Sequence, residues 1–196
     1  MATSAARWSV SFACAVLLSL AVNAGGASAA AWTHGVELTP PPNASTSGLG
    51  ANPTSISCAS AGNCSAVGDY KDSSNHQQGL LMSETSGTWA AAVEAVLPAD
   101  AATQPNVRLE SVSCTAAGNC AAVGRYTDSS NHQQALLLSE TSGTWGTGVK
   151  ADLPAGAATS PAADLASVSC TSTGNCSAVD QRDLRTIVPL FFMPPN

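Results

Sequence analysis

Three cysteine pairs are the residues of this sequence whose spacing most clearly carries chemistry. Five residues separate the two cysteines of each pair, and the interval from Cys58 to Cys114 equals that from Cys114 to Cys170. An even set of regularly spaced cysteines predicts disulfide bonds in an exported chain. A zinc site would need clustered cysteines and histidines at other spacings. We therefore expect disulfides within three pairs: Cys58 and Cys64, Cys114 and Cys120, and Cys170 and Cys176.

A polar segment, "DSSNHQQ", occurs twice and carries one histidine each time, His76 and His132. A lone histidine in a polar loop is more typical of a solvated residue than of a ligand. Hard oxygen ligands of the kind that calcium prefers also gather in the first copy. They are Asp69, Asp72, Ser74 and Asn75. The second copy has Arg125 in place of Asp69, which weighs against a calcium site.

Glu84 and Glu140 recur in "SETSG" and are the carboxylates that a hydrolase could use. Glycoside hydrolysis needs two carboxyl groups held roughly 5 to 9 Å apart across the sugar. Nothing in the sequence places such a pair, and both glutamates resemble turn residues. No nucleophile elbow, zinc-protease, phosphate-loop or dinucleotide motif occurs either. The sequence therefore predicts no catalytic, cofactor-binding or metal-binding residue and favours a protein that is not an enzyme.

The charge balance excludes one class of partner. The 196 residues include only seven Lys and Arg against thirteen Asp and Glu, for a net charge of −6. Nucleic-acid binding depends on clustered basic residues, and this chain has no such cluster. We expect no nucleic-acid partner.

The N-terminal segment, residues 1–29, has the pattern of a secretory signal peptide. Arg7 precedes an apolar run at residues 9–22, and small residues at Ala27 and Ala29 fit a cleavage site. The alternative is a membrane anchor, but the run falls short of the roughly 20 residues that a spanning helix needs. We expect residues 1–29 to be removed, the mature chain to start at Ala30, and the protein to be secreted with no membrane span.

The elements that position these residues belong to a repeat whose period equals the interval between successive cysteine pairs. Residues 57–89 and 113–145 differ at only seven positions, and a fixed period of this size indicates a repeat array. The predicted boundaries divide the chain into five further segments. These are the last strand of a partial repeat with its linker (30–56), repeat 1 (57–112), repeat 2 (113–168), the start of a partial repeat 3 (169–179) and a non-repeat tail (180–196).

Each full repeat reads as four short antiparallel strands and predicts an all-β fold. In repeat 2 the strands are "ESVSC", "CAAVGRY", "ALLLSET" and "WGTGVKADLP", separated by turn residues and closed by proline. The cysteine pair would close the first hairpin. Four strands in a unit of about 50 residues is the pattern of a β-propeller blade, so the chain holds about two full blades and partial ones. We expect three tryptophans to be packing anchors between blades: Trp32, Trp89 and Trp145.

The motif "SVSCTAAGNCAAVG", followed by "SGTW" and a proline-rich link, resembles a Cys-paired repeat of secreted bacterial proteins, especially actinobacterial ones. The match covers residues 32–179 and is similar to kelch-type propeller blades. A weaker likeness joins "SETSGTW" to the Asp-box of sialidase-like propellers, which is a structural hairpin. The resemblance implies a propeller-type fold and implies little about activity.

The tail "DQRDLRTIVPLFFMPPN" breaks the repeat after Val179. It fits either a truncated repeat or a docking tail that inserts into a partner. Open blades would expose strand edges and apolar faces, which predicts self-association or marginal stability.

Two functions remain open after the sequence analysis. One is a secreted, non-catalytic repeat protein, a binding or structural module for a surface, glycan or protein partner. The alternative is an extracellular propeller-type glycoside hydrolase or a remnant of one.

Overall fold

The structure is a computed structural model that describes residues 35–47, 50–153 and 162–180, together with the backbone of a strand at 187–192. One compact unit spans Val36–Asn196. The predicted signal peptide (residues 1–29) and Trp32 lie outside the described residues, as does most of the predicted tail.

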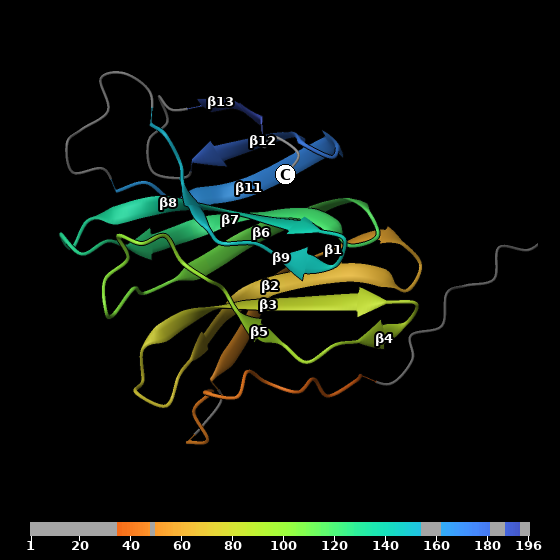
Figure 1. Ribbon diagram of the computed structural model, residues 1–196, viewed down its shortest axis with the longest axis horizontal. Helices are drawn as coiled ribbons and strands as arrows, with labels where there is room; N and C mark the ends of the chain where they lie inside the picture. Colours follow the sequence, from red (N-terminus) through yellow and green to blue (C-terminus); the bar gives the residue numbers. More distant parts are fainter. Residues whose placement is uncertain (1–34, 48–49, 154–161, 181–186, 193–196) are drawn as a thin grey trace, which may run out of the picture. The chain divides into compact units, whose positions relative to one another are not determined.

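The described residues form three antiparallel sheets and contain no helix, which confirms the predicted all-β repeat (Figure 1). No helix that could span a membrane occurs among them. The first sheet has the order β1-β2-β3, with both β4 and β5 paired to β3. Its strands are β1 (Ala51–Ser60), β2 (Asn63–Lys71), β3 (Gln77–Thr85), β4 (Thr88–Trp89) and β5 (Val93–Glu94).

The second sheet repeats this arrangement, with β9 and β10 both paired to β8. Its strands are β6 (Arg108–Ala116), β7 (Asn119–Thr127), β8 (Gln133–Thr141), β9 (Thr144–Trp145) and β10 (Val149–Lys150). The third sheet has the order β11-β12-β13. Its strands are β11 (Leu165–Ser172), β12 (Asn175–Asp180) and β13 (Ile187–Phe192). No strand of one sheet pairs with a strand of another among the described residues.

The hairpin turns follow from residues that accept a positive φ. Gly62 and its counterparts Gly118 and Gly174 have φ of 67° to 81°, a region that glycine enters without steric cost. The next turn places Ser86 and Gly87 at positive φ, as in the two-residue turns that match strand twist. Gly87 also donates a backbone hydrogen bond to the carbonyl oxygen of Gly62, so the two turns of the first sheet lie together.

The predicted fourth strand is broken in both complete sheets. In the first sheet the chain pairs with β3 at β4, leaves it, and pairs again at β5. Between these strands the Ala92 N–H donates to Thr39 in the preceding linker, and Gly148 donates to Val96 at the matching place of the second sheet. The strand is interrupted because its backbone also binds the linker that precedes the sheet.

A glycine on the second strand of each complete sheet permits close backbone approach. A Cβ at Gly68 would lie 2.2 Å from the carbonyl oxygen of Asn52, and one at Gly124 would lie 2.0 Å from that of Arg108. The partner strand carries a register shift directly after this contact. The third sheet has Asp180 at the glycine position, and β12 ends there. The loss of the repeat pattern after Val179 therefore coincides with the replacement of this glycine by Asp180, beside the same register shift.

β13 comes from the segment that the sequence analysis placed in the non-repeat tail. It pairs with β12 through Val179 opposite Ile187 and Ala178 opposite Val188. In the first sheet, β3 takes the same place beside β2. The tail thus supplies a third strand to the third sheet. The repeat boundaries themselves stay a prediction.

Successive sheets contact each other mainly through their first strands, β1 with β6 and β6 with β11. Two buried clusters fill the spaces between them. One joins Val67 and Leu81 of the first sheet to Val112 and Leu138 of the second. The other joins residues of the second sheet, including Val123, to the third sheet. The core is therefore shared between neighbouring sheets.

Candidate functional site

One disulfide closes the first hairpin of each of the three sheets, at the three cysteine pairs that the sequence predicted. The Cα atoms of each pair are 3.9 to 4.0 Å apart, closer than the roughly 5.5 Å that is typical. Each pair is directly opposite in the strand register. Because disulfides persist in oxidising compartments, the bonds point to an extracellular environment. Bonded cysteines have no free thiol to act as a nucleophile.

A ladder of serine side chains joins each sheet to the next, a role that was not predicted from the sequence. Ser55 and Ser57 of β1 accept hydrogen bonds from the backbone N–H groups of Val112 and Cys114, at 3.2 and 3.0 Å. Ser111 and Ser113 of β6 accept the matching bonds from Val168 and Cys170 of β11, at 3.2 and 3.1 Å. The recurring Ser-x-Ser-Cys pattern was the available signal.

The ladder follows from the register of the hairpins. Residues directly opposite each other alternate between hydrogen-bonded and non-hydrogen-bonded pairs along two antiparallel strands. The short Cα separation of the cysteine pairs marks them as non-hydrogen-bonded, so the N–H of Cys114 points away from β7. It would remain unpaired without Ser57 of the first sheet. The serine of one sheet therefore satisfies the backbone of the next.

Glu140 is the centre of a second contact between the first two sheets. It is only 3% exposed and accepts hydrogen bonds from Ser65 at 2.7 Å and Ser83 at 2.6 Å, both on the first sheet. The indole N–H of Trp145 also donates to Ser83, at 3.1 Å. Glu84, the repeat counterpart of Glu140, is half-buried. The structure therefore does not bring the two glutamates together and uses Glu140 to join sheets.

The tryptophans differ in their surroundings. Trp145 packs against the buried cluster that joins the first and second sheets. Trp89 packs against a smaller cluster of the first sheet, together with Leu38 of the leading segment. The anchor role of the tryptophans, including Trp32, stays a prediction.

Two exposed apolar faces lie at the ends of the described array, and we name them by their sheets. The head face of the first sheet centres on Ile56, whose side chain is 60% exposed, whereas its counterparts Val112 and Val168 are buried. A groove of about 360 Å³ lies on this face. It is lined by Leu38, Pro53, Ile56, Ala66, Met82 and Trp89, among others.

The tail face of the third sheet centres on Val179. This side chain is 44% exposed, whereas its counterparts Val67 and Val123 are fully buried against the next sheet. Ser167 and Ser169, which match the ladder serines, are exposed as well. The faces are thus the two halves of the contact that recurs inside the array.

The polar loop is organised by a buried aspartate. Asp72 accepts hydrogen bonds from the backbone N–H groups of Ser74 and His76 and from the side chain of Gln78, and Asp128 makes the same set of bonds in the second copy. The bond from Gln78 and the two backbone bonds lower the pKa of Asp72 against the opposing effect of burial.

Both carboxylate oxygens of Asp72 thus accept hydrogen bonds from its own loop and from Gln78. No group of three His, Cys, Asp or Glu that could hold a metal occurs in the part of the chain that the structure describes. His76 lies beside Asp72, with 3.6 Å between Nδ1 and Oδ2.

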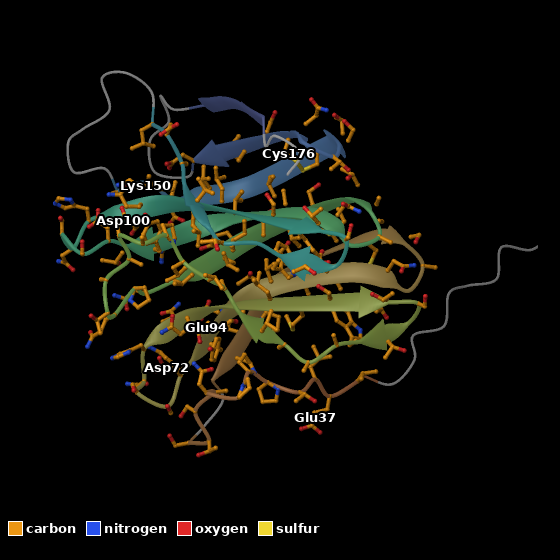
Figure 2. All side chains as sticks on the ribbon, viewed as in Figure 1. Glu37, Asp72, Glu94, Asp100, Lys150 and Cys176 are labelled. Carbon is orange, nitrogen blue, oxygen red and sulfur yellow. A yellow bond between two sulfur atoms is a disulfide. The ribbon has the colours of Figure 1, made fainter. Side chains whose placement is uncertain are left out.

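A buried tyrosine donates to a carboxylate in each complete sheet, to Glu94 in the first and to Asp100 in the second (Figure 2 labels both carboxylates). Tyr70 donates to Glu94 at 2.6 Å and lies 2.8 Å from the Oδ1 of Asn43. Tyr126 donates to Asp100 at 2.7 Å, and Lys150 lies 3.4 Å from the same carboxylate. Burial, followed by the hydrogen bond to a carboxylate, raises the pKa of both tyrosines well above its usual value.

Comparisons with known protein families, with curated proteins and with solved structures give no match.

Proposed function

We propose that the chain is a secreted, non-catalytic β-repeat protein, a binding or structural module built from propeller-type units. It is a disulfide-rich all-β repeat in which each hairpin is closed by its own disulfide. The propeller interpretation is supported by the strand order of the sheets and by the contacts between the first strands of neighbours. Signal cleavage after Ala29 and export remain part of the proposal.

One observation carries the non-catalytic interpretation: three carboxylates of the repeat, Asp72, Asp128 and Glu140, are engaged in internal hydrogen bonds. Asp72 and Asp128 hold their own loops, and Glu140 binds two serines of the neighbouring sheet. Catalytic acids and bases must come within hydrogen-bond reach of a substrate. These three groups point into the protein and stabilise it.

The hydrolase alternative would have to use Tyr70 and Glu94, since some glycosidases have a tyrosine nucleophile. Such a nucleophile must lose its proton. The raised pKa of Tyr70 keeps the phenol protonated, because both burial and the hydrogen bond to Glu94 oppose ionisation. The matching position of the second sheet has Lys150 in place of Glu94. The pair is better explained as a structural contact.

The experiment is a panel of glycosidase substrates beside a glycan-binding array, with the oxidised full chain. We expect no turnover. Turnover that Glu94→Gln abolishes and Glu84→Gln leaves unchanged would overturn the proposal. Intact mass with and without reduction tests the localisation separately. Export predicts a chain that starts at Ala30 and gains two hydrogens per disulfide upon reduction.

A further inference from the structure

We propose that the head face of the first sheet binds the tail face of a second copy of this chain. The inference rests on the proposed structural function and names its partner. The two faces are the unmatched halves of a contact that the chain makes twice within itself. A second copy brings a tail face of the right kind to every head face.

The head face repeats a surface that the structure shows in its covered form. Ile56, Ala66, Met82 and Trp89 of the groove match Val112, Ala122, Leu138 and Trp145 of the second sheet. Those four counterparts pack in the cluster that Val67 and Leu81 of the first sheet cover. A surface of this shape and composition therefore accepts the side of a preceding sheet.

The tail face carries the covering side of that same contact. Val179 matches Val67, and Ile187 of β13 takes the backbone position of Leu81 opposite it. Ser177 matches Ser65 and is exposed. The second sheet has Ala121 at this position, so Ser177 restores a hydroxyl that the middle of the array lacks.

The polar groups of the two faces are complementary. Glu84 on the head side is half-buried, and its counterpart Glu140 accepts a hydrogen bond from Ser65. In the proposed contact, Ser177 of the second copy donates to Glu84 in the same way. Ser167 and Ser169 of the second copy would accept hydrogen bonds from the backbone N–H groups of Ile56 and Cys58, as the ladder serines do within the chain.

The number of strands in each sheet also agrees with a head-to-tail contact between two copies. Each complete sheet has two short strands, such as β4 and β5, beyond its third strand, and the described part of the third sheet has none after β13. Residues 36–40 match the fourth strand of a repeat and lie on no sheet of their own, with Val36 72% exposed. Joined head to tail, residues 36–40 of one copy would complete the third sheet of the other.

The test is the mass of the secreted, oxidised full chain by sedimentation and light scattering over a range of concentrations. We expect assemblies of two or more copies that form as concentration rises. Ile56→Glu and Val179→Glu should each raise the dissociation constant more than about a hundredfold, since each buries an unpaired charge. Val149→Glu is the matched control, because Val149 is also 60% exposed but belongs to β10 of the middle sheet.

Mixing the two variants distinguishes the orientation. The Ile56→Glu chain keeps its tail face and the Val179→Glu chain keeps its head face, so the mixture should form a dimer through one contact. A head-to-head contact would instead leave Val179→Glu fully associated and would overturn the proposal. So would a chain that is monomeric at all concentrations because one of its own segments covers the head face.

The outcome is independent of the hydrolase test. A monomer without hydrolase activity would overturn self-association and leave the proposed function standing. An assembly that hydrolyses a glycan would support self-association and overturn the proposed non-catalytic function. Circular dichroism of each variant checks that it has folded.

Discussion

The first and second sheets have nearly the same sequence, yet the same positions differ widely in burial. Ile56 on the first sheet is 60% exposed, whereas Val112 on the second is 6% exposed. Glu84 is half-buried, whereas Glu140 is buried and accepts two serine hydroxyls. The difference lies in the neighbour, since the first sheet covers the second and no described sheet covers the first. Each sheet is therefore one half of two interfaces, and its stability depends on what covers it.

The largest effect should come from comparing a carboxylate placed in the core between the first two sheets with one placed at the matching position of the head face. Val112→Asp leaves an unpaired charge in the shared core and should lower the free energy of unfolding by about 3 to 5 kcal/mol. Ile56→Asp should change it by less than about 0.5 kcal/mol, because that side chain already faces solvent. Urea unfolding at concentrations where the chain is monomeric measures both. Equal losses of unfolding free energy at Val112 and Ile56 would show that the two positions do not differ in how they are covered.

The two glutamates give the next effect. Glu140→Ala leaves the hydroxyls of buried Ser65 and half-buried Ser83 without their acceptor and should cost about 2 to 3 kcal/mol. Glu84→Ala should cost well under about 1 kcal/mol in the monomer. No described sheet precedes the first one, so Glu84 has no equivalent of the serines that bind Glu140. Thermal unfolding of the two variants makes the comparison. A Glu84→Ala loss as large as that of Glu140→Ala would show that Glu84 already has an equivalent partner within the chain.

The serine ladder offers a smaller and more graded test. Ser55→Ala or Ser111→Ala removes the acceptor of one backbone N–H on the next sheet and should cost about 1 kcal/mol. Ser167→Ala, at the exposed end of the ladder, should be neutral in the monomer. Chemical unfolding of the three variants ranks them. Three equal values would mean that the ladder bonds contribute nothing.

The pH dependence gives the smallest effect, which is absent at neutral pH. The pKa of Tyr70 and Tyr126 is raised in the folded state, so the unfolded chain binds fewer protons above pH of about 10. The contribution of the tyrosines to the free energy of unfolding should therefore be constant up to that pH and fall above it, until the folded pKa is passed. Tyr70→Phe should reduce the slope. A stability that rises above this pH would contradict the raised pKa values.

Local pattern was enough to predict the repeat, the strands and the disulfides. The predicted strand "CAAVGRY" lies within β7 (Asn119–Thr127), and "ALLLSET" lies within β8 (Gln133–Thr141). These elements are set by alternation, by glycine in the turns and by the cysteine spacing, all of which act over a few residues. The predicted polar loop is a loop only at residues 128–132, because Gln133 and Gln134 already belong to β8.

The sheet-to-sheet contacts could not be predicted in the same way. Glu84 and Glu140 have identical flanking residues, so only the neighbouring sheet makes them different. The role of the serines in Ser-x-Ser-Cys depends on how strands of successive repeats lie beside each other. β13 was missed because "IVPLFF" has lost the repeat sequence while keeping its place beside β12.

Amide hydrogen exchange at Ile56 and Cys58 tests the account most directly. In the dilute monomer these two N–H groups should exchange fast, while those of Val112 and Cys114 are protected by the serines of the first sheet. As concentration rises, Ile56 and Cys58 should become protected to a similar degree, because the serines of a second copy reach them. Exchange at Ile56 and Cys58 that stays fast at every concentration would contradict the head-to-tail contact.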